Sequence, residues 1–578
     1  MNTPIDAPIQ PAQPRDRILA RLPDGRIFSA PPGSTLAAIL KAAGVDAVGA
    51  VVNQRIVELT QVLNADTDVA PILPESTDGQ RIYRRAAVVL LTTAAAELHP
   101  EAQLWIEHAA AHGRGYFCEA RGRAPFTPAE LAAIDSRMRA IVAEDAPFER
   151  RQVPREEAVS LMRARGQHDT ARLIAGRTRE TVTLYALRGR LAFSHGYLVP
   201  SAGYLRTFSL HAADGGFILS LPSHRHTGML VAPVAAGQPS PAYQYPLLFE
   251  VFEEANNWLE KLGLRSLGAL NEAIGGGRLP EIALVAEALH ESRIALIATA
   301  LANHADRFRV VLIAGPSSSG KTTFSKRLAV QLLANGLRPF PLGIDDYFLD
   351  RDATPTGPDG KPDFESLGAV DVALFNDHLQ ALLAGEAVWV PHYNFVTGKR
   401  ETGHEVRLGA NDVIVIEGIH GLNPALVPGL DPARVYRIYV SALAGLNLDC
   451  HNRIATTDIR LLRRIARDAA TRGYSAQATL QRWPSVTEGE RRNIFPYQEN
   501  CDAIFNSCLP YELAVLRLIV EPLLLQVRPG TPEYVESNRL LSLLGWVRGV
   551  TTEAVPGNSI LREFVGGSSL ADFRLWRG

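Results

Sequence analysis

The segment from Arg309 to Gly336 constrains the fold more than any other part of the chain. It begins with the apolar run RVVLIAG, which is typical of a buried strand, and ends with the helical pattern KTTFSKRLAVQLLANG. Between them, Gly315–Thr322 reads GPSSSGKT and matches the pattern G-x-x-x-x-G-K-[ST]. For this composition the chance expectation is roughly 0.004 matches before the strand and helix are required. The segment therefore predicts a phosphate-binding loop.

Each residue type in this loop has a physical reason to be there. Glycines let the backbone turn its N–H groups toward phosphate, and the following helix adds the positive end of its dipole. Lys321 is expected to reach the β and γ phosphates, and the Thr322 hydroxyl to hold Mg²⁺. The predicted nucleotide-binding residues are Gly315, Pro316, Ser317, Ser318, Ser319, Gly320, Lys321, Thr322 and Thr323. The predicted cofactors are ATP and Mg²⁺.

Two further apolar runs each end at an acidic residue. PFPLGID leads to Asp345, and DVIVIEG leads to Glu417. Alternating strands and helices predict a parallel sheet with helices on its faces, and ligands bind at the carboxyl ends of such strands. We therefore expect both carboxylates to face the phosphate-binding loop. Together with Thr322, they are the expected ligands of Mg²⁺.

A series of motifs then resembles the uridine kinase and phosphoribulokinase family, in the family's own order. The series is GPSSSGKTT, DDYF (345–348), DFESLGAVD (363–371), PHYNFVTGKR (391–400), VIVIEGIHGL (413–422) and DIRLLRRIARD (458–468). It covers about 220 residues. The resemblance implies phosphoryl transfer from ATP to a hydroxyl group of a small molecule.

The resemblance also implies roles for individual residues. Asp345 matches the catalytic base, Glu365 an acid that contacts sugar hydroxyls, and Glu417 the magnesium-associated acid. Tyr393 and Phe395 match the aromatic residues of the nucleoside pocket. The family's arginine-bearing lid segment corresponds to Arg463, Arg464 and Arg467. Arginines at this spacing share a helix face and can bind the migrating phosphate.

One position departs from the family pattern. Gly398 stands where uridine kinases carry a histidine that reads the pyrimidine edge. We therefore expect altered base preference, and we expect Gly398→His to move it toward pyrimidines if the surrounding pocket is kept.

The N-terminal half resembles the start of threonyl-tRNA synthetase. LPDGRIFSAPPGSTL and VVNQRIVEL are similar to its small β-grasp TGS domain, and FTPAELAAIDSRMRAIVAEDAPFERRQVPREEA to its editing domain. His108 and His112 preserve a histidine pair of that domain, which we expect on one helix face at i and i+4. Its second pair is replaced by Ser194 and Leu198. Because leucine moves no proton, we expect no hydrolysis of mischarged tRNA.

These observations predict a multidomain α/β protein with a C-terminal P-loop kinase. The expected divisions are a tail (1–15), a TGS-like β-grasp domain (16–78), an α+β editing-like region (79–235), a helical connector (236–304), the kinase domain (305–525) and a C-terminal extension (526–578).

Composition limits the function classes. The net charge of −2 argues against a nucleic-acid partner, and the apolar run Ala86 to Ala96 is too short to cross a membrane. The four cysteines form no CxxC pair. We therefore expect a soluble, cytoplasmic protein with a small-molecule substrate. Whether it forms a homo-oligomer stays open.

Three functions remain as alternatives. The first is phosphorylation of a nucleoside 5′-hydroxyl, and the second is phosphorylation of another hydroxylated metabolite such as a sugar phosphate. The third is a nucleotide-regulated RNA-binding protein that reads RNA through its TGS-like half.

Overall fold

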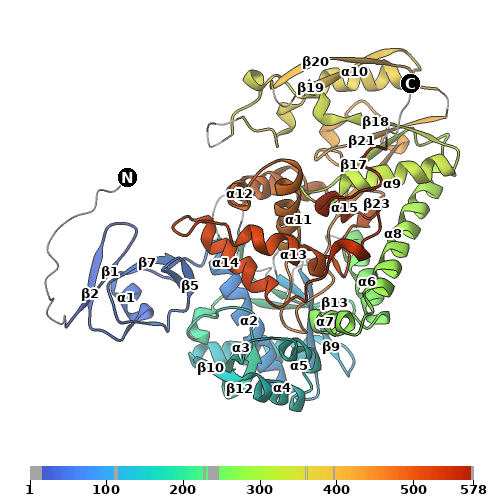
Figure 1. The fold of residues 1–578 in the computed structure, drawn as a ribbon. Helices are drawn as coiled ribbons and strands as arrows, with labels where there is room; N and C mark the ends of the chain where they lie inside the picture. The colour runs from blue at the N-terminus through green and yellow to red at the C-terminus, as the bar shows by residue number, and fades with distance from the viewer. Residues whose placement is uncertain are drawn as a thin grey trace.

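The computed structural model describes residues 16–109, 115–224, 230–231, 246–357, 360, 362–394, 397–409 and 411–573. The chain forms a small N-terminal unit, a middle α+β region, a run of helices and a C-terminal α/β domain (Figure 1). The predicted multidomain α/β fold is confirmed.

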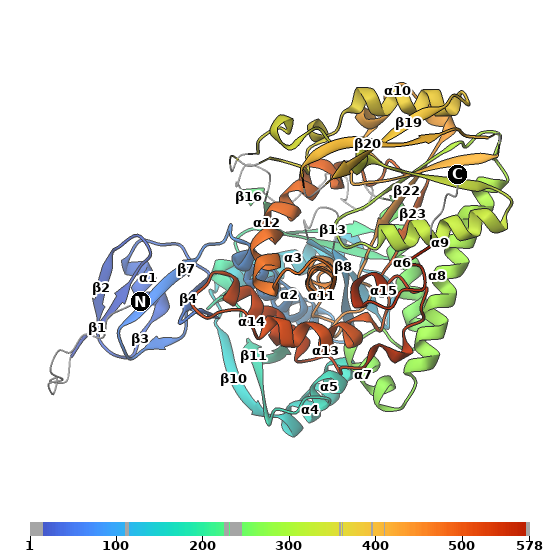
Figure 2. The ribbon, with the colours of Figure 1, turned by 45° about the horizontal axis from the view of Figure 1, so that its top comes forward.

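The N-terminal unit is a five-stranded sheet with one helix, and it lies to one side of the molecule (Figures 1 and 2). Its elements are β1 (Ile18–Arg21), β2 (Ile27–Ala30), β3 (Ser34–Thr35), α1 (Leu36–Ala42), β4 (Gly49–Val52), β5 (Arg55–Val57), β6 (Val62–Leu63) and β7 (Thr67–Ile72). The sheet order is β2-β1-β7-β4-β5. β1 and β2 pair antiparallel around Pro23-Asp24-Gly25, residues that favour a tight turn. Thr35 caps α1 by accepting a hydrogen bond from the backbone of Ala38.

The middle region holds two antiparallel sheets, ordered β13-β14-β9-β8 and β10-β11-β12. Its helices are α2 (Thr77–Leu98), α3 (Pro128–Ala143), α4 (Arg155–Ala164) and α5 (His168–Ala175). Its strands are β8 (Gln103–Ala109), β9 (Gly115–Arg121), β10 (Phe148–Pro154), β11 (Thr181–Leu187), β12 (Arg190–Phe193), β13 (Ser209–Ala213), β14 (Gly216–Ser220), β15 (Ser223–His224) and β16 (Leu230–Val231). A capping box stands at the start of α3, where Thr127 and Glu130 exchange hydrogen bonds.

The prediction of a helix around His108 and His112 is wrong. His108 lies on strand β8, which pairs antiparallel with β9, and His112 lies outside the described residues. Leu104 and Ile106 are both buried. Residues two apart on a strand point to the same side, so the spacing of these apolar residues fits one face of the sheet.

Three helices, α6 (Pro246–Lys261), α7 (Leu267–Gly275) and α8 (Leu279–Ala302), join the two halves. The long α8 packs along α9 (Lys321–Ala334) of the C-terminal domain (Figure 2).

The C-terminal domain is built on five parallel strands in the order β18-β21-β17-β22-β23. They are β17 (Val310–Ala314), β18 (Arg338–Gly343), β21 (Asp412–Glu417), β22 (Val435–Ser441) and β23 (Ala503–Asn506). A hairpin of β19 (Val388–Asn394) and β20 (Lys399–Val406) stands beside the sheet. The remaining helices are α10 (Val372–Leu383), α11 (Thr456–Thr471), α12 (Ala476–Asn493), α13 (Glu512–Leu524), α14 (Glu533–Leu544) and α15 (Arg562–Val565). The predicted phosphate-binding loop follows β17, the central strand.

The two halves of the protein share one apolar core. Buried residues of α4, α5, β11 and β12 belong to the same cluster as those of α8, α9, α11, α13 and the sheet. Among the described helices, including the 24-residue α8, none has the length and apolarity required to cross a bilayer.

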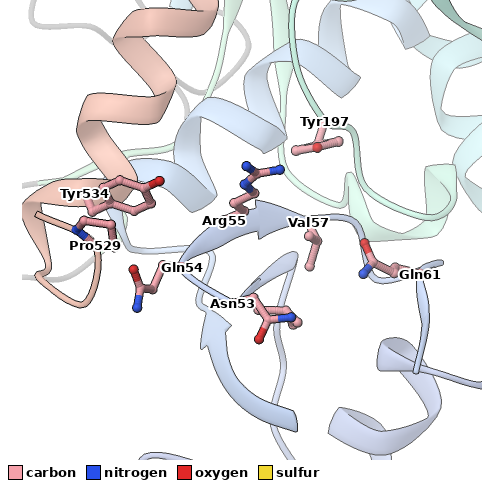
Figure 3. A pocket seen from close by; sticks show the side chains of 9 residues that line it. Asn53, Gln54, Arg55, Val57, Gln61, Tyr197, Pro529 and Tyr534 are labelled. Atoms are coloured by element: carbon pink, nitrogen blue, oxygen red, sulfur yellow. The ribbon is translucent and has the colours of Figure 1, made fainter. Parts of the chain in front are cut away.

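The N-terminal unit also touches the C-terminal extension. Figure 3 shows Gln54 and Arg55 of the β4–β5 hairpin facing Pro529 and Tyr534, with Tyr197 of the middle region nearby. These residues line a cavity of about 650 Å³, and the Gln54 side chain accepts a hydrogen bond from the backbone N–H of Gly530. The small unit is thus held at its hairpin end.

Candidate active site

The phosphate-binding loop connects β17 to α9 and adopts the backbone that its glycines predict. Gly320, which caps α9, has φ +90°, and Ser318 has φ +58°. The Lys321 ammonium folds back over the loop and donates to the carbonyl oxygens of Gly315, at 2.9 Å, and Pro316, at 3.2 Å. Burial lowers the pKa of Lys321, and the charges of Glu417, Glu563 and Glu490 oppose that shift. The lysine is held at the centre of a group of carboxylates.

A buried ion pair anchors the loop from behind at Ser317. Arg460 of α11 donates to the Ser317 carbonyl oxygen at 2.9 Å, and Glu490 of α12 accepts from the Ser317 N–H at 2.7 Å. Arg460 and Glu490 also bond to each other, and each side chain is 1% exposed. Both backbone groups of one loop residue are therefore fixed by a single arginine–carboxylate pair.

The three arginines expected on the lid segment lie in three different environments. Arg463 is fully buried, pairs with Glu512 at 2.6 Å, and donates to Ser507 and to carbonyl oxygens of the loop. Arg464 donates to the Ser317 hydroxyl at 2.7 Å. Arg467 pairs with Asp468 at 3.0 Å. Arg463 and Arg464 therefore both contact the loop from α11, Arg463 at backbone carbonyl oxygens and Arg464 at the Ser317 hydroxyl.

The two acids after the apolar strands lie at the same edge of the sheet. Asp345 sits in the short 3-10 helix Ile344–Tyr347 that follows β18, and Glu417 ends β21, where it pairs in register with Gly343. Burial raises the pKa of both carboxyls, while the charge of Lys321 lowers it. The strand topology thus brings Asp345, Glu417 and Lys321 within electrostatic reach of one another.

The expected metal ligands offer oxygen atoms of the kind Mg²⁺ binds. The Thr322 hydroxyl donates to Glu417 at 2.9 Å, and the Asp345 charge contributes to the pKa of Glu417. One hydroxyl and two carboxylates fit Mg²⁺, which commonly takes few protein ligands beside phosphate and water. Within the described part of the chain, no group of three or more His, Cys, Asp or Glu side chains forms a metal cluster.

Glu365 faces the same region from the loop before α10. Its side chain packs against Gly489, because a Cβ at that glycine would lie 2.8 Å from the Cβ of Glu365. Burial raises its pKa to about 7, with a further rise from the charge of Glu490 and opposition from Arg464 and Lys321. Both the protonated and the ionised form of Glu365 are therefore populated near neutral pH.

The expected aromatic pocket is only partly described. Tyr393 is 1% exposed and packs against Phe348 with a centroid distance of 5.6 Å, so its ring belongs to the core. Phe395 lies outside the described residues.

Gly398 has a structural reason to be glycine. It has φ +71°, and a Cβ would lie 2.7 Å from the Nε of Arg351. A histidine there would be strained and would collide with that guanidinium. Gly398→His would therefore require the Arg351 side chain to move, and its effect on base preference stays a prediction.

The sequence pattern missed the C-terminal segment that covers the loop. Glu563 accepts hydrogen bonds from the backbone N–H of Thr323, at 3.1 Å, and from its hydroxyl, at 2.9 Å. Ile560 packs on Gly320, where a Cβ would lie 2.5 Å from its Cγ2. Glu563 thus occupies donors at the N-terminal turn of α9, the type of site that binds anions. Glu490, Arg460 and Glu512 were also missed.

The editing-type residues do not form a comparable site. His108 is 4% exposed and stacks on Phe252 and Phe117, with centroid distances of 4.5 and 5.1 Å. Burial lowers its pKa to about 3. Leu198 is buried in the core, and the Ser194 hydroxyl donates to the Gly196 carbonyl oxygen.

A phosphate-binding loop at the centre of a parallel sheet, with carboxylates at the adjoining strand ends, defines a P-loop kinase domain. Residues 310–513 match the phosphoribulokinase / uridine kinase family. This match covers the C-terminal domain, and another part of the chain is similar to threonine--tRNA ligases.

Relatives match separate parts of the chain. The threonine--tRNA ligase of Acidovorax sp. (strain JS42) is 32% identical over 201 residues, which cover 34% of this chain and 31% of the ligase. A possible uridine kinase from Bacillus stearothermophilus matches with 25% identity, 23% of this chain, 70% of that chain and a TM-score of 0.20. A D-glycerate 3-kinase from Cryptococcus neoformans matches with 18% identity, 49% of this chain, 98% of that chain and a TM-score of 0.22. The chain thus spans under a third of the length of the ligase it resembles.

The raised pKa of Glu365 predicts a pH-dependent contribution to stability. Between 4.5, the ordinary value, and about 7, the folded protein keeps a proton that the unfolded chain has released. Wild-type stability should therefore fall relative to Glu365→Gln as pH rises through this window, and the difference should level off above it. Urea unfolding between about pH 5 and about pH 8 measures the difference. Glu272→Gln, at a mostly exposed glutamate, is the control. A pH-independent difference for Glu365→Gln would contradict the assignment.

The contact of Glu563 with α9 predicts competition with phosphate. Glu563→Gln keeps a hydrogen-bond acceptor but removes a negative charge, so affinity for ATP should rise by roughly three- to tenfold. Calorimetric titration of the full chain measures it, with Glu553→Gln, an exposed change in the same segment, as control. Unchanged or weaker binding would show that the carboxylate does not oppose the nucleotide.

Proposed function

We propose that the protein is an ATP-dependent kinase that phosphorylates a hydroxyl group of a small molecule, with a nucleoside 5′-hydroxyl as the leading acceptor. The observation that carries this proposal is the grouping of Lys321, Asp345 and Glu417 around the phosphate-binding loop. Phosphoryl transfer depends mainly on positioning and on stabilising charge, and this grouping offers both.

In this proposal different residues bind ATP, the metal ion and the acceptor. The loop N–H groups and Lys321 bind the phosphates of ATP, and Arg464 and Arg467 stabilise charge on the transferred group. Thr322, Glu417 and Asp345 would hold Mg²⁺, which neutralises phosphate charge when bound. Asp345 receives the proton of the acceptor hydroxyl, and its buried position favours proton uptake. Glu365 binds hydroxyls of the acceptor.

A second candidate is a kinase of another hydroxylated metabolite, such as a sugar phosphate. The observations that favour it are the buried ring of Tyr393 and the filled space beside Gly398. Both remove contacts that would recognise a pyrimidine base.

Lys321→Ala tests the central claim. Because the ammonium is held beside the loop carbonyls and surrounded by carboxylates, its loss should lower turnover by at least about 100-fold while the chain stays folded. ADP release with a panel of nucleosides and sugar phosphates measures turnover and also identifies the acceptor. Lys261→Ala, at an exposed lysine of α6, is the matched control. Near-normal turnover by folded Lys321→Ala would remove the proposal.

Asp345→Asn separates chemistry from nucleotide binding. If Asp345 accepts the hydroxyl proton, kcat should fall by about 10²–10⁴-fold while the Kd for ATP changes little. The neighbouring Asp346 accepts hydrogen bonds from His392 and from the Tyr393 backbone, so Asp346→Asn should affect stability more than kcat. Equal losses of ATP binding and kcat in Asp345→Asn would instead make this residue a ground-state ligand.

A further inference from the structure

A second large cavity lies between the middle region and the kinase domain. Its volume is about 840 Å³, and its walls come from α2, the end of β12, α6, the loop that leads into α11, α12 and α14. Among the described residues, none of those lining it belongs to the loop 315–323. The volume is that of a typical small-molecule site.

The walls carry an excess of positive charge. Seven arginines line the cavity, against two carboxylates, Asp458 and Glu488. The arginines are Arg81, Arg84, Arg85, Arg453, Arg460, Arg491 and Arg539.

Part of this charge is compensated by ion pairs. Arg539 binds Asp458 through two hydrogen bonds of 2.7 and 2.8 Å, and Arg81 pairs with Glu536 at 3.1 Å. Arg460 pairs with Glu490, as described above. These pairs hold α2, α11, α12 and α14 together around the cavity.

Two arginines are left without an acidic partner. Across the residues that the structure describes, Arg85 and Arg453 make no ion pair, and the Nε of Arg453 is buried without a hydrogen-bond partner. Both guanidinium groups interact with Tyr116, and that of Arg453 lies 5.8 Å from its ring centroid. The unpaired charges therefore face one part of the cavity.

The surroundings of these two guanidinium groups disfavour their charged form. Burial, together with the charges of Arg81 and Arg539, lowers the pKa of Arg85 to about 10, and burial lowers that of Arg453 to about 10. Both groups remain charged at neutral pH. Both side chains are half-buried and lack an acidic partner among the described residues, and groups with perturbed pKa values of this kind cluster at functional sites.

The remaining lining is uncharged. Burial, then the charge of Arg85, lowers the pKa of His195 to about 3, and burial lowers that of His451, so both imidazoles are neutral hydrogen-bonding groups. Val88, Phe252 and Leu543 add apolar surface. The cavity therefore joins anion-binding groups to an apolar wall.

We propose that this cavity binds a small phosphate-bearing molecule with an apolar or heterocyclic part, and that Arg85 and Arg453 bind its phosphate oxygens. The guanidinium fork matches phosphate geometry, and a phosphate supplies the countercharge that the protein lacks. A cavity of about 840 Å³ accommodates a nucleotide-sized molecule and is too small for a folded partner.

The test uses the full chain carrying Lys321→Ala, so that the kinase loop no longer dominates phosphate binding. Pyrophosphate, UMP and AMP are titrated by calorimetry, with malonate as a dicarboxylate probe. We expect one saturable site per chain for at least one phosphate probe. Arg85→Gln and Arg453→Gln should each weaken it by at least about tenfold, whereas Arg278→Gln, at an exposed arginine paired with Glu281, should not.

Thermal unfolding shows whether a variant loses probe binding because it is misfolded. Because Arg85 and Arg453 are uncompensated, removing either charge should leave the Tm of the free protein unchanged or raise it, while abolishing the rise caused by the probe. Three outcomes would overturn the proposal: no saturable binding of any phosphate probe, binding that survives both substitutions, or binding of malonate alone. A lower Tm with binding retained would mark the two arginines as structural.

Discussion

The phosphate-binding loop keeps its shape because buried arginine–carboxylate pairs support it from behind. Arg460 with Glu490 fixes both backbone groups of Ser317, and Arg463 with Glu512 lies beneath the next two residues. Breaking such a pair by removing one partner costs about 3–5 kcal/mol, because the other charge is left buried. The loop is consequently organised before any phosphate arrives, and α11, α12 and α13 must all be in place for that to hold.

The loop that leads into α11 attaches the N-terminal half to the C-terminal domain. The loop before α11 accepts the Ile106 N–H at the Cys450 carbonyl oxygen, and Asn452 bonds to Phe193 and His195. With a shared apolar core, these contacts make the halves one folded body rather than domains on a linker. The catalytic loop and the N-terminal half therefore depend on a common set of elements.

Local patterns in the sequence were sufficient for the parts of the fold that are specified locally. The strand–loop–helix around Lys321 and the acids that follow or end β18 and β21 were predicted from local patterns. Partners far apart in sequence could not be predicted this way: Glu490 reaches Ser317 across 173 positions, and Glu563 reaches Thr323 across 240. His108 failed for another reason, since a histidine spacing of four looks helical although pairing with β9 decides the local structure.

Arg460 lines the large cavity and also donates a hydrogen bond to the phosphate-binding loop. A molecule that shifts this guanidinium must change the energy of the loop, and a phosphate that rigidifies the loop must change the energy of the cavity by the same amount. Thermodynamic reciprocity makes the two occupancies linked variables, whatever the path of motion between them. For a ligand in the cavity, its effect on the affinity of the loop for phosphate and the effect of phosphate on the affinity of the cavity would be the same factor.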